Sequence, residues 1–587
     1  MKTFRQPLLI EFLLFILFCP LSRGTFQETS SLTLRATSHM VLLDVLAKDR
    51  RGRPVTDLKA EDLVLLEDGK PQLISAFNSV VRHNQPAFEP PSLPEHVYTN
   101  RPEYHMPNGP LTIILIDILN TSAQDQAYAR GRLLKYVAAG LKPGEPVAVY
   151  VLGRSLTLLQ DFTTDPELLR IAIEAVNPKT SLELEMADVE KRIPRIHESG
   201  GTSPVTRARI MTVVNTLREF YTEQAQAELE VRVSGTLVAF RMIGRAVAGH
   251  PGRKNLIWVS GAFPLTITKS TVQYRADLSD PNRVQPMSEI SSSYSVEGSF
   301  RQTVALLGEA QVSVYPVDAR GLVGSLVSDT SDNLTDETGQ FLTGADYGAA
   351  ITNANSKLLE DQRTMGVLAE QTGGFVFKNR NDIDDAVPAI LADSAFYYEI
   401  GYYPQNHNWN GSFRKIEVRL RRPDTEASYR HGYYALDPMR LPKGKSLSEM
   451  DLAGYVSADA PVATMVVFDV RVLPPNPAPS AHVPVDFLVD MRSVTSEQDQ
   501  QGVRKYQLDF HVAAYGTEGK LVGQQNMELV APVKPERYAA LLQSGLPFHT
   551  DLSLPPGHYR LRVAVRDEHT GFLGSLDLPL SLEKPTH

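Results

Sequence analysis

The rhythm of apolar and polar positions divides most of the chain into three regions. Residues 32–80 hold short apolar runs separated by turn sequences rich in Gly, Pro and charged residues. These runs, which predict β-strands, lie at 40–47, 63–67 and 72–77. From 111 onward, nearly unbroken apolar runs alternate with stretches of helical periodicity. From 461 to 585 the chain returns to short runs of alternating apolar and polar residues, which is typical of antiparallel sheets.

The central region is predicted to alternate between strands and helices. The expected strands lie at 111–117, 147–153, 156–162, 255–261, 312–318 and 374–378. The expected helices lie at 125–140, from 166 onward, and at 234–249, 299–310, 357–371 and 382–394. Strands separated by helices favour right-handed βαβ units with helices on both faces of a parallel sheet. The predicted fold class is therefore α/β: a doubly wound, mostly parallel sheet flanked by an N-terminal β-segment and a C-terminal immunoglobulin-like β-sandwich.

Composition divides the chain into segments. The predicted segments are a signal peptide (1–24), an N-terminal β-segment (25–83), a Pro-rich linker (84–109), an α/β domain (110–395), a β-extension (396–437), a second linker (438–460) and a C-terminal β-sandwich (461–587). Charged, Ser-rich or Gly-rich stretches interrupt the α/β domain. They predict insertions at 178–232, 262–298 and 320–355.

The first 24 residues have the pattern of a secretory signal. Lys2 and Arg5 precede the short apolar core FLLFILFC, and Ser22 and Gly24 are small residues where a signal peptidase would read the chain. We expect export across the inner membrane, so that the protein is periplasmic, envelope-associated or extracellular; an anchor that stays attached is the alternative. No other segment reaches ~18 consecutive apolar residues, so no transmembrane span is expected in the mature chain.

Charge and cysteine content exclude several classes of protein. The net charge of -9 and the absence of a concentrated Lys/Arg block argue against nucleic acid as a partner. The single cysteine, Cys19, lies inside the predicted signal, so the mature chain has no disulfide, thiolate zinc site or cysteine nucleophile. The Gly-x-Ser-x-Gly and HExxH motifs are also absent. These absences favour a non-enzymatic protein.

Polar side chains gather where the first central strand ends. The stretch LTIILIDILNTS places Asp117 at the carboxyl end of a buried strand, with Asn120, Thr121 and Ser122 just beyond it. Ligands of open α/β sheets bind at this edge. Two interpretations remain open. One is a metal site, and the other is a metal-free polar cluster in which these residues cap the next helix and Asp117 accepts backbone N–H groups.

A family resemblance rests on the order of several segments. They are RGRPVTDLKAEDLVLLEDGKPQ, IDILNT, GRKNLIWVSG, VYPVDARGL, LAEQTGGFVF, FYYEIGYYPQN, GSFRKIEVRLRRP and RHGYYA. They lie within residues 40–435, which resemble the secreted von Willebrand factor A (VWA)-related proteins found in Acidobacteria. The resemblance implies a VWA- or Rossmann-like doubly wound sheet and a non-enzymatic binding or adhesion role.

The resemblance also implies a metal-ion-dependent adhesion site. VWA domains often hold Mg²⁺ with an Asp-x-Ser-x-Ser loop, a Thr from a second loop and an Asp from a later strand. Asp117, Thr121 and Thr236 match three of these positions, whereas Leu119 and Ser260 stand where a hydroxyl and a carboxylate are expected. Mg²⁺ prefers several hard oxygen ligands. The implied site for Mg²⁺ or another divalent cation is therefore degenerate.

Asp318 is the candidate replacement for the missing carboxylate. It ends a later strand at the same edge, and in the strand order of the family the strands of Asp117 and Asp318 flank the strand that ends at Ser260. Asp318 could instead pair with Arg320 or Arg253. Similarly, Thr236 could simply help to cap a helix that begins there.

The expected function is binding of a protein partner at this edge of the sheet. Asn120, Ser122 and Ser260 form the predicted partner-binding loop, with or without a cation. A metal-dependent enzyme that uses Asp117 and Asp318 is the first alternative, although no general base or fuller carboxylate set accompanies them. A purely structural envelope component is the second alternative.

Overall fold

The computed structural model describes most of the chain from residue 40 to residue 582. The described stretches are 40–81, 90–105, 111–139, 146–186, 204–263, 266–277, 280–295, 297–321, 344–380, 383–393, 395–436, 460–473 and 481–582. The predicted signal peptide and all but the last residue of the predicted second linker lie outside the described residues.

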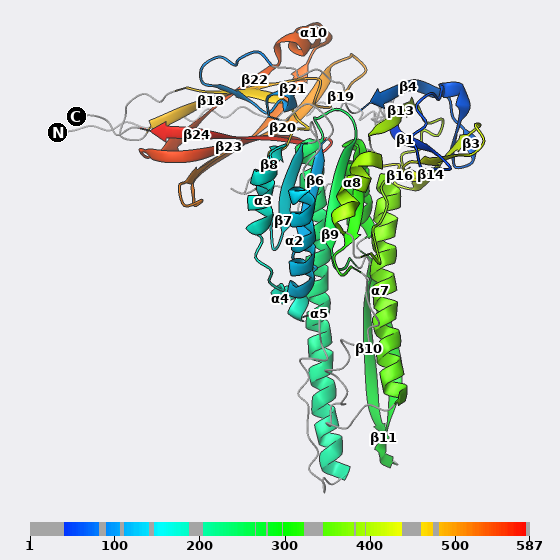
Figure 1. The fold of residues 1–587 in the computed structure, drawn as a ribbon. Coiled ribbons are helices and arrows are strands. Elements are labelled where there is room, and N and C mark those ends of the chain that lie inside the picture. The colour runs from blue at the N-terminus through cyan, green and yellow to red at the C-terminus, as the bar shows by residue number, and fades with distance from the viewer. Residues whose placement is uncertain are drawn as a thin grey trace, which may run out of the picture.

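A five-stranded sheet forms the centre of the molecule (Figure 1). Its strands are β6 (Thr112–Asp117), β7 (Val147–Leu152), β8 (Leu156–Thr163), β9 (Lys254–Ser260) and β12 (Val312–Asp318), in the order β12-β9-β6-β7-β8. The β12–β9, β9–β6 and β6–β7 pairs are parallel, and the β7–β8 pair is antiparallel. As expected, β9 lies between β6 and β12, so Asp117, Ser260 and Asp318 end neighbouring strands.

Helices cover both faces of this sheet. One face packs against α2 (Ala123–Ala138), α3 (Pro166–Glu174) and α8 (Ile383–Asp393). The other face packs against α5 (Pro204–Val247), α6 (Glu297–Glu309) and α7 (Gly344–Thr372). The strands have side chains buried on both faces because both are covered, which explains their nearly unbroken apolar sequences.

Strands from two distant parts of the sequence form a β-module. They are β1 (Val41–Asp49), β2 (Leu63–Glu67), β3 (Lys70–Pro71), β4 (Ile74–Val81), β13 (Phe396–Tyr402), β14 (Phe413–Leu420), β15 (Thr425–Ser428) and β16 (Gly432–Tyr434), with the short 3-10 helix η1 (Ala60–Asp62). Two sheets, β15-β1-β13-β4 and β16-β14-β2-β3, share one apolar core. All their pairings are antiparallel.

The C-terminal sandwich has two further antiparallel sheets. Its elements are β17 (Phe468–Val472), β18 (Ala481–Val489), β19 (Glu497–Gln498), β20 (Arg504–Gly516), β21 (Leu521–Val533), α10 (Pro535–Ser544), β22 (Leu546–Leu554), β23 (Gly557–Asp567) and β24 (Leu573–Leu582). β5 (Val97–Thr99), which precedes the short helix α1 (Pro102–His105), pairs with β17. The stretch predicted as a Pro-rich linker therefore contributes a strand to this sandwich.

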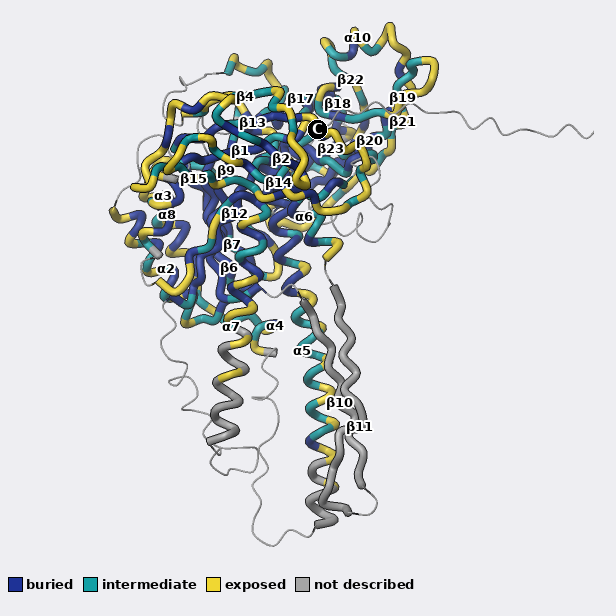
Figure 2. Tube along the Cα trace, turned by 90° about the vertical axis from the view of Figure 1, so that its right-hand side faces the viewer, coloured by how far each residue is buried: buried dark blue, intermediate teal, exposed yellow. Residues whose placement is uncertain are grey.

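A long projection leaves the carboxyl edge of the five-stranded sheet (Figures 1 and 2). It contains residues 204–231 of α5, the antiparallel pair β10 (Thr266–Asp277) and β11 (Asp280–Ser295), and residues 344–360 of α7. The short helix α4 (Leu182–Met186) lies at its base, beside α5. The projection thus begins at the same edge where Asp117 lies.

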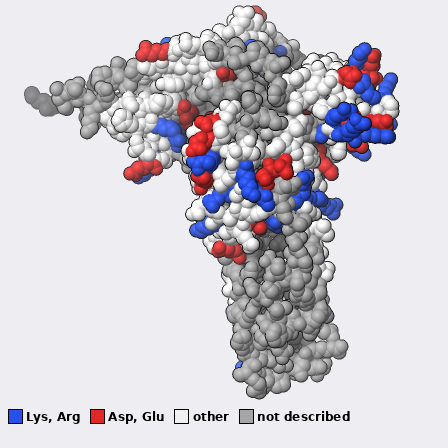
Figure 3. Space-filling view, in the orientation of Figure 1, with Lys and Arg blue, Asp and Glu red and all other residues white. Residues whose placement is uncertain are grey.

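Acidic and basic side chains are interspersed on the face shown in Figure 3. On the β-module, Arg50 lies 2.5 Å from Asp424, and Arg422 lies 2.5 Å from Asp57. These basic groups are therefore neutralised locally and form no one-sided field of the kind that attracts phosphates.

The predicted fold class was wrong for this chain. Within the described residues, parallel pairing of strands is confined to the central sheet, and the strands of the other sheets pair antiparallel. The chain is therefore mostly β-structure in several sheets, and is not a single doubly wound parallel α/β domain. The prediction gave most weight to the alternation of strands and helices from 111 to 394. It underestimated the β-segments before and after that region, because their pairings join residues far apart in sequence.

Two local predictions were also wrong. The helix expected at 234–249 does not begin there, because α5 continues through it from Pro204 to Val247. The strand expected at 374–378 is reduced to a single bridge between Phe377 and Val317. Gly373, with a positive φ of 83°, turns the chain directly after the end of α7, just before this stretch.

Candidate functional site

Asp117 is completely buried at the end of β6. Its Oδ1 accepts a hydrogen bond from the backbone N–H of Asn120 at 3.0 Å. Its Oδ2 accepts three more, from Asn120 Nδ2 at 2.9 Å, Trp258 Nε1 at 3.0 Å and Ser260 Oγ at 2.8 Å. All these donors belong to neutral groups.

The surroundings of Asp117 disfavour its charge. Burial raises the pKa of this carboxyl above its usual 3.8, while the hydrogen bonds from Asn120, Ser260 and Trp258 act in the opposite direction. Trp258 is itself fixed by edge-to-face contacts with Phe240 and Phe263, at ring-centroid distances of 5.0 and 5.2 Å. The carboxyl therefore lies between a polar cluster and an aromatic core.

Asn120 links this carboxyl to α5. Its Nδ2 also lies 2.9 Å from Thr236 Oγ1, and its Oδ1 accepts a hydrogen bond of 3.2 Å from Arg232 Nη1. Thr236 Oγ1 donates to the carbonyl of Arg232 at 2.9 Å. Thr236 thus lies deep inside a continuous helix that begins at Pro204, one turn after Arg232, and the expectation that it caps a helix N-terminus was wrong.

Arg232 brings a buried positive charge to the same cluster. Only 4% of it is exposed, and its Nε has no hydrogen-bond partner among the described residues. Burial lowers the pKa of Arg232, and the nearby carboxylates of Asp117 and Asp361 raise it. A cation that belongs to the protein therefore faces the Asp117 cluster.

The side chains and carbonyl groups of the loop after Asp117 are bonded to neighbouring segments of the protein. Thr121 Oγ1 accepts the backbone N–H of Gly261 at 2.9 Å, and the carbonyl of Thr121 accepts Gln126 Nε2 at 2.7 Å. Ser122 caps α2, because its Oγ accepts the N–H of Asp125. Asn120, Thr121 and Ser260 are all at most 2% exposed.

A neighbouring segment also covers this loop. Ser181 Oγ donates to the carbonyl of Leu119 at 2.8 Å, and Thr180 Oγ1 accepts the N–H of Ala123 at 2.9 Å. The side chain of Leu119 is buried in the apolar core on the α5 face. The predicted partner-binding loop is therefore part of the interior, except for the half-buried Ser122.

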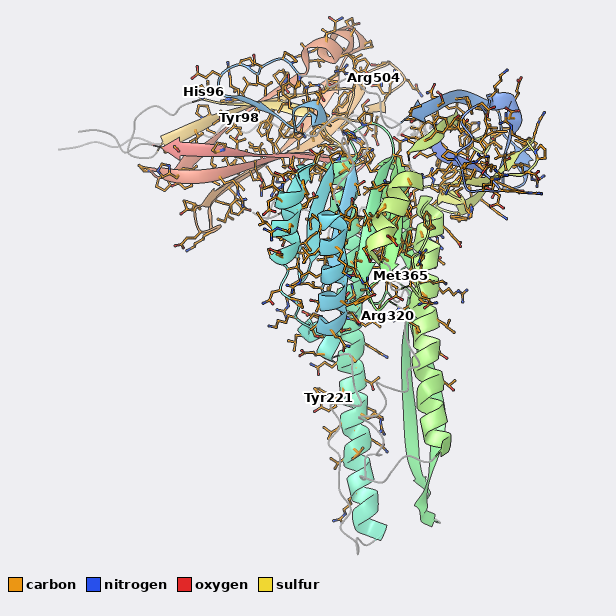
Figure 4. The ribbon with its side chains drawn as sticks, in the orientation of Figure 1. His96, Tyr98, Tyr221, Arg320, Met365 and Arg504 are labelled. Atoms are coloured by element: carbon orange, nitrogen blue, oxygen red, sulfur yellow. The ribbon has the colours of Figure 1, made fainter. Side chains whose placement is uncertain are left out.

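Asp318 forms a separate ion pair. Arg320 donates to both of its oxygens, from Nε at 2.8 Å and from Nη2 at 3.0 Å. Gln362 Nε2 adds a hydrogen bond of 3.0 Å, and Arg320 also reaches Asp361. Figure 4 shows Arg320 at the base of the projection, in the region of Met365 of α7. Of the two alternatives for Asp318, the structure contains the pair with Arg320.

The residues present do not fit the divalent cation that the resemblance implies. Asp117 is the one carboxylate in its hydrogen-bonded cluster, and all its described contacts are donors that would oppose a cation. Leu119 offers no ligand atom, and Asp318 is engaged by Arg320. No group of three or more His, Cys, Asp or Glu side chains among the described residues could hold a metal ion. We therefore derive no chemistry through a metal at this edge.

The sequence identified most, but not all, of this cluster. The structure brings Asp117, Asn120, Thr236 and Ser260 together, and it places Thr121 in the adjoining loop and Asp318 in its own pair. Trp258 and Arg232 were missed. A signal for Trp258 was available, because residues two apart on a strand share a face and Ser260 was already a candidate. No sequence signal indicated Arg232, because the register of α5 against the sheet follows only from packing.

No protein-family model matches the chain, and no curated protein matches it. Several solved structures are similar to this chain, including the following three. An aerotolerance-related membrane protein from Bacteroides fragilis is 13% identical with a TM-score of 0.24, covering 49% of this chain and 98% of its own. The conserved hypothetical protein BatB from Bacteroides thetaiotaomicron is 15% identical with a TM-score of 0.21, covering 48% and 98%. Three N-terminal domains of the type V pili tip protein Mfa5 from Porphyromonas gingivalis are 9% identical with a TM-score of 0.23, covering 94% and 78%.

Proposed function

We propose that this protein is exported, is not an enzyme, and binds a protein partner through the projection. The observation that carries the proposal is a row of exposed apolar side chains on α5. Val213, Phe220 and Val231 are 57%, 59% and 55% exposed. Large apolar side chains this exposed, grouped on one element, are typical of interaction surfaces.

The three side chains share one face of the helix. Steps of seven and eleven residues correspond to about two and three turns at ~3.6 residues per turn. Val213, Phe220 and Val231 therefore lie along a single line, and the exposed Ala227 lies on the same line. We call this line the α5 seam. The labelled Tyr221, whose ring lies 5.6 Å from that of Phe220, marks the position of the seam on the projection in Figure 4.

The seam replaces the contact surface that the sequence suggested. Asn120 and Ser260 are buried, so a partner could reach them only if the loop opened. The projection starts at the same edge of the sheet and extends well beyond it (Figure 2). A partner that approaches this edge would meet the projection first. The proposed contact surface for the partner is therefore on α5 and not on the loop.

The charges beside the seam indicate the chemistry of the partner. Residues 213–231 contain Glu219, Glu223, Glu228 and Glu230 against the single base Arg218. Glu219 and Glu230 are exposed. A second copy of α5 would bring like charges together, which is unfavourable. We propose that the partner presents an amphipathic helix whose apolar face is flanked by Lys or Arg.

Site-specific photo-crosslinking in the source cells tests the proposal. A photoreactive amino acid replaces Val213, Phe220 or Val231 in the full chain, and matched controls replace Leu73 and Val522, which are 78% and 45% exposed on the two β-rich parts. We expect the three α5 positions to capture the same partner and the controls not to do so. Crosslinks at the controls alone, at none of the positions, or equally at all five would refute binding of the partner at the α5 seam.

A further inference from the structure

A cavity of about 520 Å³ lies where the β-module, the helical layer and the C-terminal sandwich meet. Each part supplies several of its walls. The lining includes Met40, Trp409 and Arg430 of the β-module, Gly308 and Glu309 at the end of α6, and Phe572 of the C-terminal sandwich. The cavity is distinct from the Asp117 cluster, which shares none of these residues. Its volume falls in the range of about 300–1,000 Å³ that is usual for small-molecule sites.

Glu309 is the unusual group in this cavity. Glu309 lines the cavity, and part of its side chain is accessible to solvent. This accessible surface faces the cavity. Its carboxyl accepts no hydrogen bond from any described residue. It is also the last residue of α6, where the helix dipole disfavours a negative charge. Burial raises the pKa of Glu309 to about 7, although Arg430 acts to lower it.

Arg430 does not neutralise Glu309 on its own. Its Nη2 donates to the carbonyl of Leu42 at 3.1 Å, and its charge is shared with Asp44. The guanidinium lies against Gly308, where a Cβ would come within 1.9 Å of Nη1. Arg430 is therefore held in place by a backbone carbonyl on one side and a glycine on the other. Among the described residues, none pairs with the Glu309 carboxyl, which faces the cavity.

Aromatic rings form much of the remaining wall. Arg414 lies over the rings of Trp409 and Tyr433, at 5.0 and 5.7 Å from their centroids. Phe572 contributes an apolar wall from the C-terminal sandwich. Fixed rings next to a single unpaired carboxyl suit a ligand that has an apolar body and one cationic nitrogen.

We propose that this cavity binds a small amphipathic primary amine, with the ammonium group paired to Glu309 and the apolar body packed on Trp409 and Phe572. An anionic ligand fits less well. Arg430 already faces the carboxyls of Glu309 and Asp44, and Arg492 is held by Asp490 at 2.6 Å. This inference does not depend on the α5 seam, because the two sites lie on different parts of the molecule.

Tryptophan fluorescence of the full chain provides the test. The chain has two Trp residues, and Trp258 is buried at the Asp117 cluster, so Trp409 reports on the cavity. The probes are phenethylamine, the neutral 2-phenylethanol and the anionic phenylacetate. We expect saturable quenching by phenethylamine at millimolar concentration or below, weaker binding of the other two probes, and loss of the response in Trp409→Phe.

The pH dependence and one matched variant complete the test. With the pKa of Glu309 at about 7, ionisation of the carboxyl predicts about tenfold tighter binding of phenethylamine at pH 8 than at pH 6. Glu309→Gln is expected to abolish this dependence and the preference for the amine. Glu297→Gln, at the other end of α6, is expected to preserve both. Absence of binding, equal binding of all three probes, or preference for phenylacetate would overturn the proposal. So would a Glu309→Gln variant that keeps the pH dependence and the preference for the amine.

Discussion

The indole Nε1 of Trp258 donates a hydrogen bond of 3.0 Å to Oδ2 of Asp117. The carboxylate that ends a buried strand thereby accepts a hydrogen bond from a neutral donor on the neighbouring strand. Together with the donors from Asn120 and Ser260, this contact makes Asp117 a structural centre of the sheet edge.

Replacing Asp117 with Ala should lower the free energy of unfolding by about 3 kcal/mol, since several buried donors lose their acceptor together. Trp258 Nε1, Asn120 Nδ2 and Ser260 Oγ all donate to this carboxylate. Chemical denaturation at neutral pH measures the change. Asp165→Ala, which removes only the exposed cap of α3, should cost about 1 kcal/mol and serves as the control. Equal losses for both variants would contradict the central role of Asp117.

Addition of Mg²⁺, Mn²⁺ or Ca²⁺ at millimolar concentration should leave the thermal midpoint unchanged. The described oxygens of the Asp117 cluster are bonded to the protein's own donors, and Arg232 supplies a positive charge there. A real site would add ~2.7 kcal/mol of stability at a ligand concentration of 100 Kd. A saturable shift that disappears in Thr236→Val would show instead that this edge binds a cation.

The stability of the protein should rise between pH 7 and pH 10 because of Lys254. Its Nζ donates to the carbonyl of Ala310 at 2.7 Å, and the side chain is only 1% exposed. Burial lowers the pKa of Lys254 from 10.5 to about 7, so between these values the unfolded chain binds more protons than the folded protein. The rise could reach about 5 kcal/mol at most, from a shift of about 3.5 pKa units.

Lys254→Met should remove this rise, and Lys135→Met should retain it because Lys135 is exposed on α2. Denaturation curves at pH 6, 8 and 10 measure the effect for all three proteins. At pH 6 the penalty for burying the charged lysine is fully present. The stability of Lys254→Met should therefore exceed that of the wild type by the largest amount at this pH. Parallel pH profiles for the wild type and Lys254→Met would refute the assignment.

Substitution by alanine at two glycines of the central domain should change the stability of the protein in opposite directions. At Gly374 a Cβ would come within 2.0 Å of the carbonyl oxygen of Val314, so the backbone would have to shift. Gly374→Ala should therefore cost about 1–3 kcal/mol, the usual range for overpacking. Gly131 lies in α2 with nothing within 4 Å of its Cβ position, and Gly131→Ala should stabilise by about 0.5–1 kcal/mol. Denaturation midpoints of the two variants check both signs.

The sequence alone determined the elements around the site. The apolar run of residues 111–117 predicted β6, and Asp165 with Pro166 predicted the start of α3, whose N-cap Asp165 accepts the N–H of Glu167. Such signals are local, because an apolar run and a capping hydrogen bond each involve only residues close together in the sequence. The positions of Asp117, Ser260 and Asp318 on neighbouring strands followed from the resemblance.

Only the tertiary structure decided what these residues do. Whether Asp117 holds a cation or accepts hydrogen bonds depends on Trp258 and Arg232, which approach it from 141 residues away on β9 and from α5. The overall fold class was decided in the same way, because antiparallel pairs such as β1–β13 and β5–β17 join strands that are hundreds of residues apart. Hydrophobic patterns specify which face of a strand is buried, but they do not specify its partner. That choice is made by packing between distant segments.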